Sequence, residues 1–121
     1  MLIVEDEPTI RDLLQELLLQ AGFDVGCASN GLVALEVLAH WSPDLIVLDL
    51  MMPVMDGFAF ARACRSAHPG SGPGVIVMSA AIDSEAAATT LGARGWIQKP
   101  FDVEDMLKLV AEHVPAHPFQ K

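Results

Sequence analysis

Basic residues are scarce in this sequence. The chain of 121 residues contains 7 Lys and Arg residues against 16 Asp and Glu residues, which gives a formal net charge of −9. Proteins that bind DNA or RNA neutralise the backbone phosphates with Lys and Arg side chains. The charge balance therefore argues against direct nucleic-acid binding by this chain.

Long apolar runs are also missing. A helix that crosses a bilayer needs about 20 predominantly apolar residues, and no run in this chain approaches that length. The N-terminus lacks the charged start and the long apolar segment of a signal peptide, because Met1 leads directly into the strand-like Leu2-Ile3-Val4. We therefore expect a cytoplasmic protein that does not contact the membrane.

Cysteine is rare as well. The two cysteines, Cys27 and Cys64, do not have the spacing of a metal site. In a chain without a secretory signal, such a pair is most simply two reduced, packed thiols. A disulfide between them is the weaker alternative.

The sequence does contain a strong apolar pattern. Apolar residues make up 52% of the chain, and its length is sufficient for one domain with a proper core. Strand-like runs at residues 2–4, 23–28, 45–48, 75–78 and 95–98 alternate with helical patterns at about 8–21, from Asn30 to Trp41, at 57–67, at 83–92 and at 102–114. This alternation predicts an α/β fold, in which a parallel sheet carries helices on both faces.

The same pattern sets the domain organisation. We predict one domain over residues 1–114, and residues 115–121 as a C-terminal tail or the start of a linker. The segment from His68 to Gly74 is composed of Gly, Pro, Ser and His, so we predict a flexible loop there and no domain boundary.

Asp49 directly follows the most apolar of these runs, Leu45-Ile46-Val47-Leu48. Pro53 and Asp56-Gly57 come soon after it and are turn signals. Asp49 is therefore expected at the carboxyl end of a central strand, where open α/β sheets bind their ligands. The alternative is that Asp49 merely caps the following turn.

Other predicted strands also end in polar side chains. Glu5 and Asp6 follow the first strand, Ser79 ends the fourth and Lys99 follows the fifth. If these strands are neighbours, three carboxylates share one crevice with a hydroxyl and an ammonium group. Carboxylates that close repel one another unless a hard cation joins them, and Mg²⁺ prefers oxygen ligands. The set is suited to a phosphoryl group beside a metal ion.

With these residues in view, the sequence resembles the receiver domains of two-component response regulators. The resemblance covers nearly the whole chain. Four segments carry it, in the same order and spacing as in the family: Val4-Glu5-Asp6-Glu7-Pro8, Leu48-Asp49 through Pro53 to Asp56-Gly57, Met78-Ser79-Ala80, and Gly92-Ala93-Arg94-Gly95-Trp96 leading to Lys99-Pro100-Phe101. The family implies a single (βα)5 domain with a five-stranded sheet of flavodoxin-like order 2-1-3-4-5.

The resemblance also implies a role for each matching residue. Asp49 looks like the phosphoacceptor. Glu5, Asp6, Asp49 and the backbone carbonyl of Met51 look like the Mg²⁺ ligands. Ser79 matches the hydroxyl that follows the phosphoryl group, and Lys99 matches the lysine that pairs with it. A cis bond between Lys99 and Pro100 is expected, because receivers often have one there and proline permits it.

Trp96 occupies the position of the aromatic residue that turns inward when receivers are activated. Family members more often have Tyr or Phe there, so we predict Trp96 as the switch aromatic and keep a fixed Trp in a docking surface as the alternative. The helix before it, between Ser79 and Gly92, is unusually short. This departure from the family pattern affects the surface that the fourth helix and fifth strand offer to partner proteins.

The predicted protein is thus a phosphorylation switch and not a metabolic enzyme, and it catalyses only its own phosphorylation and dephosphorylation. The family implies a sensor histidine kinase or a histidine phosphotransfer protein as phosphodonor, and an output domain or target protein as recipient of the signal. Three alternatives remain. An aspartyl-phosphate phosphatase would need an acid where Met51 stands, a flavodoxin-like cofactor binder would need a phosphate loop in place of Glu5-Asp6-Glu7, and a degenerate receiver would act only as a docking module.

Overall fold

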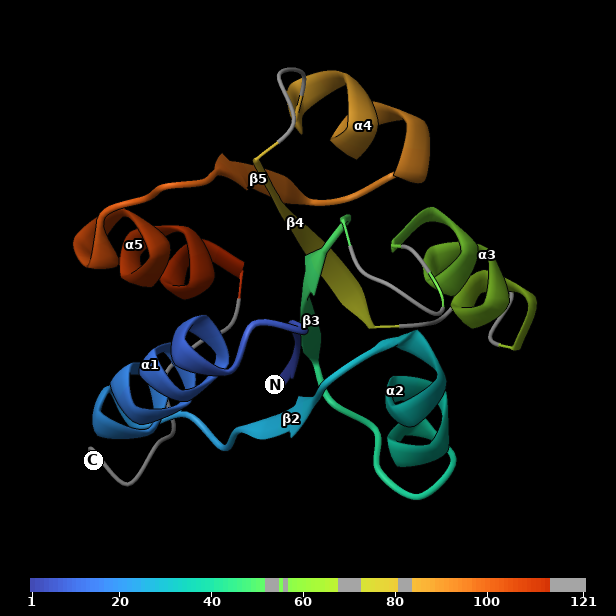
Figure 1. Cartoon of the computed structure of the whole chain (residues 1–121), viewed down its shortest axis with the longest axis horizontal. Helices are drawn as coiled ribbons and strands as arrows, with labels where there is room; N and C mark the ends of the chain where they lie inside the picture. The colour runs from blue at the N-terminus through green and yellow to red at the C-terminus, as the bar shows by residue number, and fades with distance from the viewer. Residues whose placement is uncertain (52–54, 56, 68–72, 81–83, 114–121) are drawn as a thin grey trace.

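In the computed structural model, five strands and five helices alternate along the part of the chain that is described (Figure 1). The structure describes residues 1–51, 55, 57–67, 73–80 and 84–113. The predicted turn residues Pro53 and Asp56, most of the predicted loop at 68–74 and the predicted tail at 115–121 lie outside these residues.

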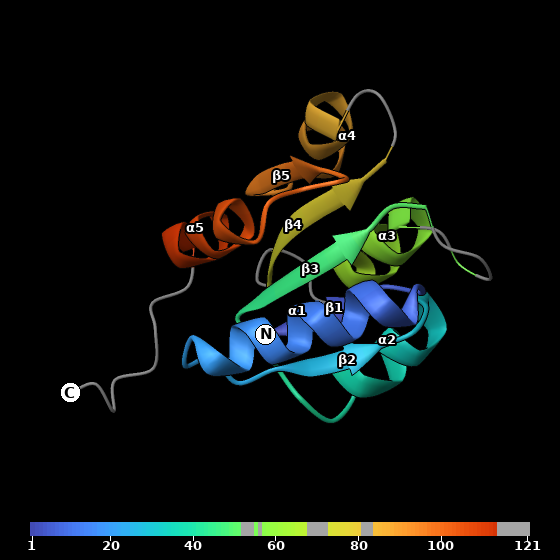
Figure 2. The same cartoon turned by 60° about the vertical axis from the view of Figure 1, so that its left-hand side comes forward.

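The strands form one parallel sheet in the order β2-β1-β3-β4-β5. The arrows of β2, β3, β4 and β5 run in a common direction in Figure 2. The bounds are Leu2–Val4 for β1, Gly26–Ala28 for β2, Leu45–Asp49 for β3, Gly74–Ser79 for β4 and Gly95–Gln98 for β5. The predicted fold class and strand order are confirmed.

The second strand is shorter than predicted. The pattern suggested a strand over 23–28, but β2 begins only at Gly26. The reason is the length of its partner: β1 has three residues, and Leu2, Ile3 and Val4 pair with Gly26, Cys27 and Ala28. Phe23, which lies outside the paired region, is buried against the core instead of joining the sheet.

Helices cover both faces of the sheet, with α1 and α5 on one side and α2 and α3 on the other (Figure 1). Their bounds are Pro8–Gln20 for α1, Gly31–Leu38 for α2, Gly57–Ala67 for α3, Ser84–Leu91 for α4 and Val103–His113 for α5. The short α4 was predicted from the spacing between Ser79 and Gly92.

Alternate residues of each strand enter two separate cores, as the twofold period of a strand requires. Val4, Leu48 and Val77 belong to the core between the sheet and helices α2, α3 and α4. Phe60 is fully buried in this core. The intervening strand residues pack with α1 and α5; they include Ile3, Val47, Ile76 and Met78. Because the central strands are buried on both faces, their polar residues are confined to the strand ends.

Local signals fix the helix ends. Asn30 caps α2 as predicted, since its Oδ1 accepts a hydrogen bond from the Val33 amide at 2.9 Å. Gly22 and Gly92, which follow α1 and α4, have φ angles of 98° and 69°. Such left-handed conformations favour glycine and end helices.

Both cysteines are free thiols, as expected. None of the helices within the described ranges is long and apolar enough to cross a membrane.

Candidate functional site

Four strands deliver the predicted site residues to one edge of the sheet. Glu5 and Asp6 follow β1, Asp49 ends β3, Ser79 ends β4 and Lys99 follows β5. Glu5 and Ser79 are fully buried and Asp49 is 2% exposed, whereas Asp6 is partly buried. Buried polar residues are expensive unless they have partners, so this cluster needs a chemical explanation.

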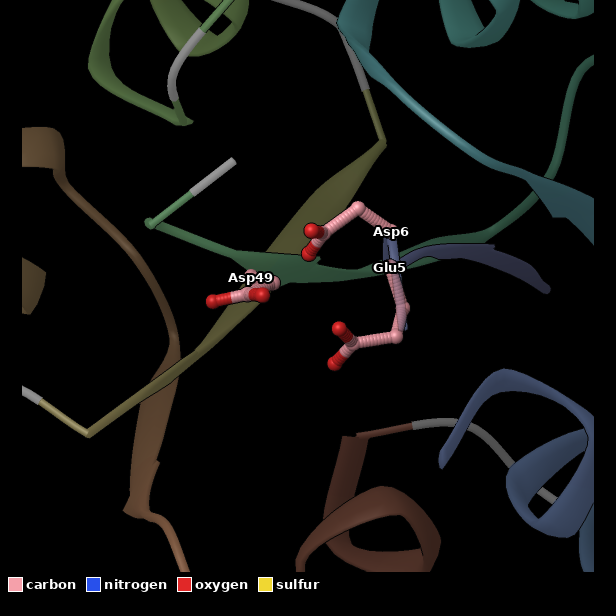
Figure 3. Close-up of side chains that lie close together, drawn as sticks. All are labelled: Glu5, Asp6 and Asp49. Atoms are coloured by element: carbon pink, nitrogen blue, oxygen red, sulfur yellow. The ribbon is translucent and has the colours of Figure 1, made fainter. Parts of the chain in front are cut away.

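Three carboxylates converge between the ends of β1 and β3 (Figure 3). Glu5, Asp6 and Asp49 each offer one oxygen, and these oxygens all lie within 4.8 Å of one another. Like charges this close raise the free energy of the site unless a cation or a proton neutralises them. A set of carboxylate oxygens is what Mg²⁺ takes as ligands, so the donor chemistry of the cluster fits that ion.

Lys99 supplies a positive charge to the same cluster. Its Nζ donates to Glu5 Oε1 at 2.7 Å and to Asp49 Oδ2 at 3.1 Å, and its side chain is 16% exposed. Burial by itself would lower the pKa of Lys99, but the hydrogen bond with Glu5 and the charge of Asp49 outweigh it and raise the pKa. Lys99 is therefore held as a cation between two carboxylates.

Glu5 is the most constrained member of the acidic pair. Its Oε1 binds Lys99, and its Oε2 accepts a hydrogen bond from the Glu7 amide at 3.1 Å. Burial raises the pKa of Glu5 to about 7, against the lowering effect of the Lys99 hydrogen bond. The buried carboxylate is thus only partly compensated by Lys99, and a further positive charge would stabilise its ionised form.

Asp49 has both carboxylate oxygens engaged. Oδ2 binds Lys99, and Oδ1 accepts a hydrogen bond from the Met51 amide at 3.1 Å. The Met51 side chain is 64% exposed. The predicted role of the Met51 carbonyl as a metal ligand stays a prediction.

Ser79 and Lys99 are joined through the backbone. The Lys99 amide donates to the Ser79 carbonyl at 2.8 Å, so the ends of β4 and β5 are tied together beside the carboxylates. The peptide bond between Lys99 and Pro100 is cis, as expected. These residues bring a hydroxyl and an ammonium group to the same end of the sheet as Asp49.

Trp96 lies apart from this cluster, within β5 opposite Val77 of β4. Its side chain is 42% exposed, which makes it one of the large apolar side chains on the surface. Its outward position is compatible with both predicted roles, the switch aromatic and the docking residue.

A small pocket adjoins the site. Its volume is about 290 Å³, and it lies between the first turns of α1 and the segment after β5. Its lining consists of Ile10, Leu13, Ala80, Lys99, Pro100 and Phe101. The walls are thus apolar apart from Lys99, and Leu13 at the rim is 49% exposed.

Two residues of the site were missed in the sequence. Glu7 belongs to the acidic run after β1, yet it caps α1 by accepting a hydrogen bond from the Thr9 amide at 3.0 Å. Arg11 donates to the backbone carbonyls of Glu5, at 3.1 Å, and Asp6, at 3.5 Å. The available signal was that Arg11 is the only basic residue between Pro8 and Gln20, one helical turn beyond the acidic run.

Comparisons with known proteins agree with this geometry. The family model of the response regulator receiver domain matches residues 1–111. Regulatory protein AtoC of Escherichia coli is 38% identical over 111 residues, which cover 90% of this chain and 24% of AtoC. The DNA-binding dual master transcriptional regulator RpaA of Synechocystis is 37% identical over 111 residues, 90% of this chain and 46% of RpaA. This chain spans less than half the length of these curated relatives.

Solved structures of similar proteins share the fold. Chemotaxis protein CheY4 of Vibrio cholerae matches with a TM-score of 0.84 and 30% identity, over 93% of this chain and 96% of that one. Response regulator TrrA of Thermotoga maritima, solved in complex with Mg²⁺ and BeF, matches with a TM-score of 0.81 and 28% identity, over 93% and 96% of the two chains.

Proposed function

Because this chain belongs to the response regulator receiver family, whose members are the phosphorylation switches of two-component systems, we propose that Asp49 is its phosphoacceptor. One observation carries the assignment: Asp49 ends the central strand β3 with a buried carboxylate held between an acidic pair and Lys99. Asp49 Oδ1 does accept a hydrogen bond from the Met51 amide, as in a turn cap, but a cap alone requires neither the neighbouring acidic pair nor Lys99. The alternative of a degenerate docking module is not supported, since the expected carboxylates, hydroxyl and ammonium group all lie at the carboxyl ends of the strands.

The reaction follows from the chemistry of these groups. A carboxylate oxygen of Asp49 attacks the phosphorus of a phosphohistidine, an O–P bond forms, and the P–N bond breaks as the imidazole leaves. Phosphoryl transfer depends on positioning and charge neutralisation more than on covalent help from other side chains. Lys99, already within 3.1 Å of Asp49 Oδ2, is positioned to neutralise a phosphoryl oxygen carried by that carboxylate.

Glu5, Asp6, Asp49 and the backbone carbonyl of Met51 are the proposed ligands of Mg²⁺. When bound, the ion would supply positive charge for the phosphoryl oxygens. The raised pKa of the buried Glu5, about 7, supports this proposal, because its ionised form needs more positive charge than Lys99 provides. Glu5 and Asp6 thereby act through charge and position, and Asp49 alone is the nucleophile.

Ser79 and Trp96 are the proposed switch residues. Ser79 would donate a hydrogen bond from its hydroxyl to a phosphoryl oxygen, since it ends the strand next to β3. Trp96 would turn inward from its exposed position on β5. A switch of this kind requires two arrangements of nearly equal free energy, which a local change of charge can bias.

The partners follow from the family. We assign a sensor histidine kinase or a histidine phosphotransfer protein as phosphodonor, and the apolar pocket beside Lys99 supports docking of such a protein next to Asp49. An output domain or separate target would receive the signal, because the matched region makes up less than half of the curated relatives AtoC and RpaA. The cytoplasm is the proposed location.

The test is phosphorylation by acetyl phosphate in the presence of Mg²⁺, followed by intact mass. The parent protein is expected to gain one phosphoryl group, and Asp49→Asn is expected to gain none. Asp44→Asn is the matched control, because Asp44 is an exposed carboxylate just before β3, at the opposite end of the strand. Lys99→Ala should retain some phosphorylation but lose the response of its partners. Equal labelling of the parent and Asp49→Asn would refute the assignment.

A further inference from the structure

The guanidinium of Arg11 reaches from α1 back to the loop that carries the acidic pair. Its Nη1 donates to the carbonyl oxygen of Glu5 at 3.1 Å and to that of Asp6 at 3.5 Å. Arg11 is partly buried, and it makes no ion pair within the part of the chain that the structure describes. Its recorded side-chain contacts are therefore with the backbone of the two acidic residues.

These two carbonyls lie just beyond the sheet. β1 ends at Val4, and the Glu5 amide still donates to the Ala28 carbonyl of β2 at 3.1 Å. The carbonyls of Glu5 and Asp6 follow this last strand-like hydrogen bond. A charged donor makes hydrogen bonds roughly twice as strong as a neutral one. Arg11 thus holds the loop where the regular hydrogen bonding of the sheet stops.

The two acidic side chains depend on that loop to different degrees. The Glu5 carboxylate has its own partners, Lys99 and the Glu7 amide. The Asp6 carboxylate has no recorded hydrogen bond or ion pair within the described residues. Its place beside Asp49 is therefore determined mainly by its backbone, which Arg11 contacts.

We infer that Arg11 is a positioning residue of the cation site, which fixes the backbone of Glu5 and Asp6 so that their carboxylates converge with Asp49. The inference rests on the proposed Mg²⁺ role of this cluster. Groups that orient metal ligands typically change metal affinity by about 10–100-fold when they are removed.

Charge and positioning predict opposite effects at Arg11. A nearby guanidinium repels Mg²⁺, so removal of its charge alone should tighten Mg²⁺ binding. Loss of positioning should weaken it. A weaker affinity after neutralisation of Arg11 therefore cannot be a consequence of charge.

The first experiment is a calorimetric Mg²⁺ titration of the metal-free parent, Arg11→Met and Arg62→Met. Methionine keeps an apolar stem but removes the donors. Arg62 is an exposed residue of α3 and provides the matched loss of charge. We expect the Mg²⁺ dissociation constant of Arg11→Met to rise about tenfold, while that of Arg62→Met stays at or below the parent value. Equal constants for the two variants would overturn the inference.

Arg11→Lys gives a second variant if Arg11→Met does not fold. Lysine keeps the charge, but its ammonium is one bond nearer the backbone than Nη1, the nitrogen that contacts both carbonyls, so it cannot reach the same position. We expect severalfold weaker Mg²⁺ binding with unchanged net charge, and phosphorylation by acetyl phosphate that returns to the parent rate at saturating Mg²⁺. Parent-like affinity in Arg11→Lys would mean that charge alone matters, which also contradicts positioning.

A measurement without metal separates this inference from the proposed function. Hydrogen exchange of the Glu7 amide, which donates to Glu5 Oε2, reports on the loop directly. We expect faster exchange in Arg11→Met than in Arg62→Met. Unchanged exchange would refute the positioning role, whereas faster exchange in a protein whose parent does not bind Mg²⁺ would leave positioning intact and refute the proposed metal site.

Discussion

Lys99 Nζ lies 2.7 Å from Glu5 Oε1, although 94 positions separate the two residues in the chain. This contact is shorter than the 3.1 Å contact between Lys99 and the proposed phosphoacceptor Asp49. In this structure Lys99 is therefore bound more closely to Glu5 than to Asp49. Lys99 would have to shift its contacts when a phosphoryl group is attached to Asp49.

The first prediction concerns the stability of this pair. Lys99→Met should lower the free energy of unfolding by about 2–3 kcal/mol, because it leaves a buried carboxylate without its cation. Adding Glu5→Gln to Lys99→Met should restore part of the loss, since the unpaired charge is then gone. Denaturant unfolding of the two single variants and the double variant gives the coupling free energy. Strictly additive losses would show that the pair is not coupled.

The second prediction concerns Mg²⁺ and stability. An ion that binds only the folded protein at 100 times its dissociation constant stabilises it by about 2.7 kcal/mol. MgCl₂ should therefore raise the melting temperature of the parent above its value in EDTA, at matched ionic strength. Asp6→Asn should lose most of this gain, and without metal it should be at least as stable as the parent, because one repelling charge is removed.

Asp44→Asn is the control for that measurement, because Asp44 lies outside the acidic cluster. Its melting temperature should respond to Mg²⁺ as the parent does. If Mg²⁺ raised the melting temperature of Asp6→Asn as much as that of the parent, this would argue against Asp6 as a ligand.

The third prediction concerns Gly57 at the start of α3. A Cβ atom at this position would lie 2.7 Å from Leu50 Cα and 3.0 Å from the Asp49 carbonyl oxygen, which are backbone atoms. Gly57→Ala should therefore destabilise the protein by about 1–3 kcal/mol. It should also slow phosphorylation, because the chain directly after Asp49 must move.

Gly95→Ala is the matched comparison. Its nearest contact, at 2.9 Å, is Leu109 Cδ1, the end of a side chain that can change its rotamer. Thermal melts should therefore show a smaller loss for Gly95→Ala than for Gly57→Ala. The reverse order would contradict the close packing of α3 on Leu50.

The fourth prediction concerns pH. Burial raises the pKa of the Cys64 thiol from 9.0 to about 11, so the folded state keeps this proton more tightly than the unfolded state. The stabilisation is complete below pH 9.0 and is lost as the pH rises towards about 11. By linkage, a pKa shift of this size corresponds to about 2–3 kcal/mol in the free energy of unfolding.

The measurement is denaturant unfolding of the parent and Cys64→Ala across this pH range. The free energy of unfolding should fall more steeply with pH in the parent, because only the parent has this thiol to ionise on unfolding. Parallel curves would show that Cys64 does not contribute to the alkaline loss of stability.

The sequence was sufficient to predict the order of elements and that Glu5, Asp6, Asp49 and Lys99 lie close together, whereas the roles of these residues stay predictions. The apolar run before Asp49, the Asn30 cap and the spacing of Ser79 and Lys99 are local signals, and each has a direct counterpart in the structure. Because parallel strands bring their carboxyl ends to one edge, correct strand ends were enough to predict which residues meet.

The contacts within the site could not be predicted in the same way. Whether Lys99 prefers Glu5 or Asp49 depends on distances set by the packing of β1, β3 and β5 together. Glu7 directly follows Glu5 and Asp6 in the chain, but the helix start at Pro8 draws its carboxylate to the Thr9 amide and not into the cluster. The predicted start of β2 was wrong for a similar reason. The length of β2 follows from its pairing with the three residues of β1, which its own residues do not reveal.

The strand order has a consequence for protein synthesis. Glu5, Asp6 and Asp49 leave the ribosome well before Lys99, and the last strand β5 pairs with β4 at the end of the strand order. A domain folds as a unit, and contacts between residues distant in sequence form slowly. If β1 and β3 pair before β5 docks, the three carboxylates lie side by side without Lys99, so the docking of β5 completes the charge balance of the site.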